Sequence, residues 1–265
     1  DLPLWPLMFI TIACGAVSGF HATQSPMMAR CLTNERYGRS AFYGAMIAEG
    51  FIALVWAGAA QGFYGGPGAL GAALASGGPG EVVYEVCTTI LGTVGGVLAV
   101  LGVVVLPITS GDTAFRVARL IAADYLKLSQ HRARNRYLIA VPMFAVAAAL
   151  NFIDFGVIWR YFGWANQTLA AVTLWAGAVY LARRRSRWWL AAAPATFMTA
   201  VTTAYIMVEE VGLGLPQRTG TLIGLAVALA ALAWFLAVRP RLPPEEDAPI
   251  PGAQPTAAER AGDSL

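Results

Sequence analysis

Long apolar stretches alternate with short polar connections along most of the chain. Seven of these stretches hold about 20 residues, which is the length a helix needs to cross the hydrocarbon core of a bilayer. They lie at approximately 4–22, 41–61, 88–107, 137–155, 163–182, 188–208 and 219–238. The fourth is the weakest, because it is short and contains Pro142. The pattern predicts an all-α fold, a polytopic helical membrane protein with about seven transmembrane helices.

The composition supports lipid as the solvent. Of the 265 residues, 57% are hydrophobic and 12% are charged, whereas soluble domains carry about 25% charged residues. The net charge of +3 does not indicate nucleic acid, because the basic residues fall in short connections between apolar runs. We therefore expect membrane lipids, and no nucleic acid, as partners.

The basic residues are distributed very unevenly between alternate connections. One set of connections, with the C-terminal tail, holds 16 of them, and the other set holds only Arg160 and Arg218. The set of 16 comprises Arg30, Arg36, Arg39, Arg116, Arg119, Lys127, Arg132, Arg134, Arg136, Arg183, Arg184, Arg185, Arg187, Arg239, Arg241 and Arg260. Because cytoplasmic loops are enriched in Lys and Arg, this asymmetry predicts a cytoplasmic C-terminus and a first helix that begins outside.

The chain is predicted to consist of a transmembrane domain over 1–239 and a tail over 240–265. The tail is rich in Pro, Ala and acidic residues, which predicts a disordered cytoplasmic segment. The stretch 62–87 contains GGPG twice and is expected to be an external loop. Cys14, Cys31 and Cys87 lie far apart, so neither a disulfide nor a zinc site is indicated.

Residues 113–130 have a different, amphipathic pattern. Arg116, Arg119, Lys127 and Gln130 share one face of a helical wheel, opposite an apolar face. This arrangement predicts a helix that lies on the cytoplasmic membrane surface with its cationic face outward. The alternative is a basic connecting helix with no role in lipid binding.

Three segments carry polar groups at membrane depth, and the first is 11–26 at the end of the first run. Polar side chains there need internal partners or water, and a helix broken at this point would free backbone groups to hold a solute or an ion. The alternative is a packing seam of Gly15 and Gly19 before an ordinary helix end at Pro26. The predicted substrate-binding residues are Ser18, Gly19, His21, Thr23 and Gln24.

The second segment is 106–113, where Pro107 and Gly111 are expected to end the third helix. Thr109, Ser110, Asp112 and Thr113 then offer oxygen ligands of the kind that a coupling sodium ion prefers. Capping of the following helix by Asp112 or Ser110 is an equally good interpretation.

The third candidate is Glu49, which lies near the middle of the second run. A carboxylate at mid-membrane is costly, and by default it is a functional hypothesis. Since a carboxyl group can exist neutral, Glu49 could carry a proton across the membrane. The alternative is that its side chain makes a structural hydrogen bond to a neighbouring helix. Weaker candidates are Asn151, Asp154, Thr199, Thr202 and Thr203, while Glu209 and Glu210 are expected to be solvated at the external interface.

No motif of a common enzyme class accompanies these residues. Walker A, HExxH, GxSxG and Rossmann sequences are absent. The histidines are only His21 and His131, which does not supply a histidine-rich metal site. We therefore expect no enzymatic activity, and no cofactor or metal beyond a coupling proton or sodium ion. A membrane-embedded enzyme using His21, Glu49 and Asp112, and a seven-helix receptor, remain as alternatives.

Three stretches carry a resemblance to a known family. They are CGAVSGFHATQSPMMARC at 14–31, YGAMIAEG at 43–50 and LPITSGDTAFRVARLIAADYLK at 106–127. This set resembles the bacterial carbon starvation protein A family over roughly residues 4–160. The resemblance implies a multi-pass protein of the bacterial inner membrane that takes up peptides or pyruvate during nutrient limitation. Because family members are much longer and the chain begins at Asp1 without a methionine, we expect an N-terminal half to be missing.

The resemblance also implies an architecture. The family is thought to be related to amino acid–polyamine–cation transporters, which have two inverted five-helix repeats. The first run here would be the broken first helix of the second repeat, and the third run would supply Ser and Thr ligands to sodium. The expected function is proton- or cation-coupled uptake of a small-molecule solute, with a sensor of nutrient state that does not transport as the alternative. The oligomeric state is left open.

Overall fold

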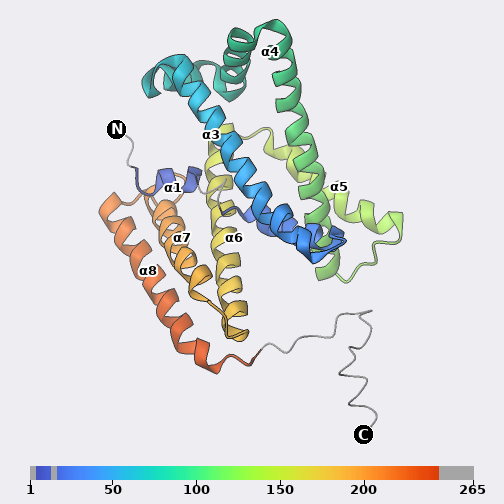
Figure 1. Ribbon diagram of the computed structural model, residues 1–265, viewed down its shortest axis with the longest axis vertical. Helices are drawn as coiled ribbons and strands as arrows, with labels where there is room; N and C mark the ends of the chain where they lie inside the picture. The colour runs from blue at the N-terminus through green and yellow to red at the C-terminus, as the bar shows by residue number, and fades with distance from the viewer. Residues whose placement is uncertain (1–3, 13–16, 245–265) are drawn as a thin grey trace.

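The computed structural model describes residues 4–12 and 17–244, and within these ranges every regular element is helical (Figure 1). The predicted all-α fold is thereby confirmed. The helices are α1 (Leu7–Ile12), α2 (Gly19–Cys31), α3 (Ala45–Tyr64), α4 (Pro67–Tyr125), α5 (Ala133–Leu150), α6 (Phe155–Arg183), α7 (Trp189–Val208) and α8 (Gln217–Val238). Short helical turns cover Glu35–Tyr37, Arg39–Gly44 and Arg239–Arg241.

Four helical segments of the described chain are long and apolar enough to cross a membrane. They are Glu35–Tyr64, Pro67–Tyr125, Trp189–Val208 and Gln217–Arg241. The last two coincide with the predicted runs 188–208 and 219–238. The first predicted run is divided between α1 and α2, and the count of seven spans stays a prediction.

The best-packed part of the molecule is the layer formed by α6, α7 and α8, which lie side by side (Figure 1). Small residues bring these helices close together, as is typical of membrane helix pairs. A Cβ on Gly224 of α8 would lie 2.6 Å from the carbonyl oxygen of Ala200 on α7, so only glycine fits there. On the other side of α6, the helix α2 lies between α6 and α4.

The predicted external loop 62–87 is wrong, because helix resumes at Pro67 after only Gly65 and Gly66. The helix α4 is interrupted at Gly78 and Gly92, whose φ angles are 73° and 68°. Glycine adopts this left-handed conformation without steric cost. The residues between these glycines include the good helix formers Glu81, Glu85 and Leu91, and they stay helical. The glycines therefore mark two sharp bends, not a long loop.

Two prolines that were expected to end helices do not. Pro107 lies inside α4, which continues to Tyr125, and Pro26 lies inside α2, which continues to Cys31. A proline removes one backbone hydrogen bond, and membrane helices tolerate this when neighbouring groups compensate. Residues 113–125 of the predicted surface helix 113–130 are thus the last part of α4, whereas Lys127 and Gln130 lie in the turn beyond its end.

Arg183, Arg185 and Arg239, near the ends of α6 and α8, lie together at one end of the α6–α8 layer. Arg183 Nε donates to the carbonyl oxygen of Pro243 at 3.2 Å, and the Arg239 guanidinium lies 4.5 Å from the centre of the Trp188 ring. Arg160 lies near Glu209 at the other end of α6. This separation is what a concentration of basic residues in alternate connections predicts. Which end faces the cytoplasm stays a prediction.

That orientation can be tested with single cysteines at two exposed serines, Ser76 and Ser186. In a background that lacks the native cysteines, we expect an impermeant maleimide to label Ser76→Cys in intact cells. Ser186→Cys should be labelled only after permeabilisation, because it lies among the basic residues 183–187. Labelling of both from the same side would contradict the predicted topology.

Candidate functional site at the broken first helix

The first predicted span is interrupted, as its polar cluster suggested. The helix α1 ends at Ile12 and α2 begins at Gly19, with Ser18 in an extended conformation at the N-cap. Cys14 and Gly15 lie outside the described residues, as does the tail from 245 onward. The break therefore precedes Pro26 by several residues.

Asn166 of α6 binds the start of α2. Its Oδ1 accepts from the backbone N–H of Phe20 at 2.9 Å, and its Nδ2 lies 3.1 Å from Ser18 Oγ. Ser18 Oγ also accepts from the same N–H at 3.2 Å. Ser18 and Asn166 are only 5% and 8% exposed. A helix N-terminus leaves backbone donors without intrahelical partners, and these two side chains satisfy one of them in the protein interior.

Gln167, the next residue of α6, binds the other side of the break. Its Nε2 donates to the carbonyl oxygen of Ile10 in α1 at 3.2 Å. The side chain is 0% exposed, and its Oε1 has no hydrogen-bond partner among the described residues. Consecutive residues of one helix thus hold both halves of the broken helix.

A cavity of about 210 Å³ lies against this arrangement. Its lining includes Thr11 from α1, Tyr205 from α7, and Arg160, Asn166 and Gln167 from α6. Arg160 Nη1 is 3.8 Å from Glu209 Oε2, which is long for a charge-assisted hydrogen bond. The cavity wall therefore combines a guanidinium with the amide side chains of Asn166 and Gln167.

Asn166 and Gln167 were not among the site residues predicted from the sequence, and Arg160 entered only the predicted topology. One signal was available: an adjacent Asn-Gln pair inside the apolar run 163–182. Polar side chains inside a membrane helix generally face other helices or a cavity, which is what both do here.

The structure brings together two residues that were predicted for different roles. His21 Nε2 on α2 lies 3.0 Å from Glu49 Oε2 on α3. The two side chains are 31% and 49% exposed, and His21 Nδ1 is buried with no partner among the described residues. A residue expected to face the solute is thus paired with the expected proton carrier, close to the break.

The other predicted substrate residues differ in their surroundings. Gly19 packs so tightly that an added Cβ would lie 2.4 Å from the Asn166 carbonyl oxygen. Thr23 Oγ1 donates to the carbonyl oxygen of Phe20 at 2.8 Å, within the same helix, and Gln24 is half-buried on α2. Ser18 and Gly19 both lie against Asn166 at the break, and a substrate role for Thr23 and Gln24 stays a prediction.

The predicted ion-binding residues do not converge in this structure. Thr109 and Thr113 donate to carbonyl oxygens of their own helix, and Ser110 is exposed. Asp112 Oδ2 accepts from Arg116 Nη2 at 2.7 Å. Within residues 4–12 and 17–244, no three His, Cys, Asp or Glu side chains gather as a metal site.

Most of the weaker candidates have structural partners. Asn151 Nδ2 donates to the Ala147 carbonyl oxygen, and Asp154 caps α6 by accepting from the N–H of Val157. Thr199 Oγ1 accepts from Trp175 Nε1 at 3.0 Å, and Thr202 donates within α7.

Comparison with known proteins identifies the family. The family model described as "Carbon starvation protein CstA" matches residues 2–64 and 68–205. The chain belongs to the CstA family. This confirms the resemblance found in the sequence and, with the four apolar helices, shows a membrane protein.

The relatives of this CstA family member differ in length. An uncharacterized protein of Haemophilus influenzae is 51% identical over 121 residues, which is 46% of this chain and 88% of that protein. "Pyruvate/proton symporter BtsT" and "Peptide transporter CstA" of Escherichia coli are each 51% identical, over 59 and 55 residues. These matches cover 20% of this chain and only 8% of each transporter. No solved structure matches.

Proposed function

We propose that the chain forms part of a secondary active transporter of small organic nutrients in the bacterial inner membrane, with its C-terminus in the cytoplasm. Family membership supports transport of peptides or pyruvate, since those are the solutes in the names of the relatives. The observation that carries the proposal is the helix break between α1 and α2, which Asn166 and Gln167 hold from both sides. Broken helices at membrane depth form solute and ion sites in many transporters.

The solute would lie in the cavity beside the break. Pyruvate and peptides share a carboxylate, and the Arg160 guanidinium in the cavity wall matches that group in charge and in planar geometry. Gln167 Oε1 has no hydrogen-bond partner within residues 4–12 and 17–244, and leaving a buried acceptor unpaired costs about 1–3 kcal/mol. A peptide N–H or a water molecule supplies a donor.

The His21–Glu49 pair would couple transport to protons. Glu49 can exist neutral, so it can bind a proton on one side and release it on the other as access alternates. Its partner lies three residues beyond Ser18 at the break, so a change in the proton occupancy of Glu49 acts directly on the start of α2. Sodium binding at 109–113 has less support, because Asp112 is already paired with Arg116.

Uptake measurements test the proposal. Cells that express the whole gene product should accumulate labelled pyruvate or labelled dipeptides above the level of cells without it. A sensor without transport would bind the same solute in membranes but give no flux. Binding without flux would therefore replace the transporter by the sensor.

Arg160→Gln tests the solute position. The charged hydrogen bond to a carboxylate is worth about 1.5–3 kcal/mol, so we expect the half-saturating solute concentration to rise about tenfold to a hundredfold. Arg218→Gln is the matched control, because Arg218 is the other arginine of the predicted external set and is exposed at the start of α8. Equal effects of the two substitutions, measured at equal membrane abundance, would argue against a carboxylate at Arg160.

A further inference from the structure

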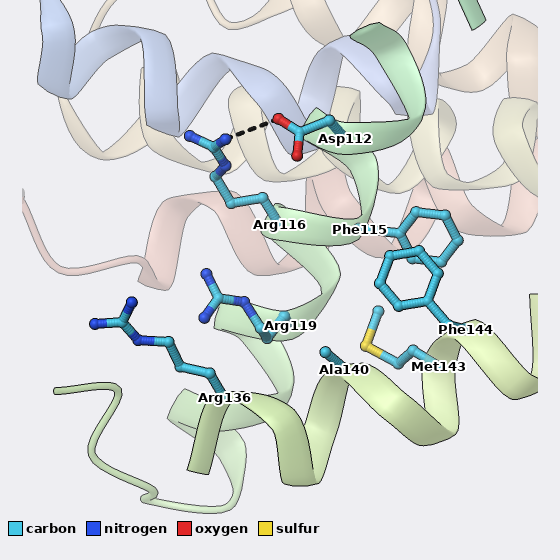
Figure 2. Close-up of a pocket in the computed structure, with 8 residues that line it drawn as sticks. All are labelled: Asp112, Phe115, Arg116, Arg119, Arg136, Ala140, Met143 and Phe144. Atoms are coloured by element: carbon cyan, nitrogen blue, oxygen red, sulfur yellow. Dashed lines mark hydrogen bonds and ion pairs between the residues drawn. The ribbon is translucent and has the colours of Figure 1, made fainter. Parts of the chain in front are cut away.

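A second cavity, of about 410 Å³, lies between the last turns of α4 and the first half of α5 (Figure 2). Three arginines line it, Arg116 and Arg119 from α4 and Arg136 from α5. The guanidinium groups of Arg119 and Arg136 reach from the two helices toward the same side (Figure 2). The cavity is separate from the helix break and is not used in the proposed transport site.

The turn between the two helices fixes these arginines. Arg119 Nη1 donates to Gln130 Oε1 at 3.0 Å, and Arg136 Nε donates to the carbonyl oxygen of Gln130 at 2.7 Å. One residue therefore holds two like-charged side chains, and each bond uses one of the five N–H donors of a guanidinium. The remaining donors suit an anion that can accept from both groups.

The charge of the cavity wall is unbalanced. Asp112 pairs with Arg116 at 2.7 Å and offsets one positive charge, which leaves Arg119 and Arg136 to give an excess of two. Lys127, Arg132 and Arg134 lie in or beside the same turn. Planar guanidinium groups recognise phosphate oxygens in a bidentate manner, so phosphate is the group that this wall fits best.

The opposite wall of the cavity is apolar. Phe115 and Phe144 stack with their ring centres 4.4 Å apart, and Met143 lies beside them. Leu138 and Val141, on the same helix α5, are exposed hydrophobic residues. A ligand that meets both walls has an anionic head and a hydrocarbon chain.

We propose that this cavity binds the phosphate headgroup of an anionic phospholipid, with an acyl chain against Phe115 and Phe144. Basic pockets between membrane helices commonly bind such headgroups, and the cytoplasmic leaflet is rich in anionic lipids. The basic residues at this end of α4 belong to the set predicted to face the cytoplasm, which places the cavity at the level of those headgroups.

The test measures thermal stabilisation of the purified protein in detergent as a function of added phosphatidylglycerol. We expect phosphatidylglycerol to stabilise the wild type and phosphatidylcholine not to. The variant Arg119→Gln/Arg136→Gln should bind phosphatidylglycerol about 100-fold more weakly, because a hydrogen bond between charged groups is worth at least about tenfold in affinity for each arginine. The control Arg132→Gln/Arg134→Gln removes the same charge outside the cavity wall and should stay within about twofold of wild type.

Three results would overturn the proposal. Equal losses in the two double variants would show that the turn attracts anionic lipid only through its total charge. Equal stabilisation by phosphatidylcholine would exclude headgroup recognition. Stabilisation by inorganic phosphate at the same concentration would identify a soluble anion as the ligand. If the glutamine variant does not fold, Arg119→Lys/Arg136→Lys keeps the charge, and it should still lose severalfold in affinity because lysine cannot bind phosphate in a bidentate manner.

Discussion

Glu49→Gln should abolish accumulation driven by a pH gradient while leaving solute exchange largely intact. Glutamine keeps the shape of the protonated carboxyl and a polar group beside His21, but it cannot lose a proton. With one proton moved per solute, a gradient of one pH unit sustains about tenfold accumulation. We expect this ratio to fall to about one in the variant, whereas counterflow of labelled solute, which needs no net proton movement, should persist.

Two further variants locate the proton. Glu35→Gln removes an exposed carboxylate outside the His21–Glu49 pair and should leave accumulation unchanged. His21→Gln retains a donor toward Glu49, so accumulation should be reduced but present if Glu49 is the carrier, and lost if the imidazole carries the proton.

The sodium alternative predicts a different pattern. In that case Glu49→Gln would still accumulate solute on a sodium gradient, and Ser110→Ala would abolish the accumulation. Failure of Glu49→Gln to reach the membrane, with wild-type behaviour of Glu35→Gln, would show that the contact with His21 is structural.

The length of an apolar run was enough to predict the last two helices. The runs 188–208 and 219–238 became α7 and α8 almost to the residue, because each is one uninterrupted apolar segment. The sequence did not show whether a helix bends or ends at Gly78, Gly92, Pro26 and Pro107. A glycine or proline shows where a helix can bend, but it does not by itself show whether the helix ends, and α4 continues past Pro107 to Tyr125.

The residues of the site that lie on α2 were predicted from the sequence, whereas Asn166 and Gln167 on α6 were not. The cluster from Ser18 to Gln24 indicated the break because its polar residues are adjacent in sequence. Asn166 meets Ser18 across 148 positions, and His21 meets Glu49 across 28. Such pairs depend on how helices pack against each other, which the periodicity of a single sequence does not contain. The Asn-Gln pair was visible only as polar groups in an apolar run.

Asn166→Leu should disrupt the break itself. Leucine has the same branched arrangement of heavy atoms as asparagine, but it removes the partner of the Ser18 hydroxyl and the closer of the two acceptors of the Phe20 N–H. Each buried group left unsatisfied costs about 1–3 kcal/mol, so we expect a lower melting temperature. Uptake should fall at least about tenfold at equal membrane abundance, because the start of α2 loses its anchor on α6.

Asn166→Asp separates the role of the cap from that of general packing. A carboxylate still accepts from the Phe20 N–H and from the Ser18 hydroxyl, and a helix N-terminus stabilises negative charge. We therefore expect Asn166→Asp to recover most of the melting temperature that Asn166→Leu loses. Thr168→Val is the matched control on α6, since its hydroxyl donates only to Trp164 of the same helix. If Asn166→Leu transports within about twofold of Thr168→Val, the break does not depend on Asn166, and the solute site must be sought elsewhere.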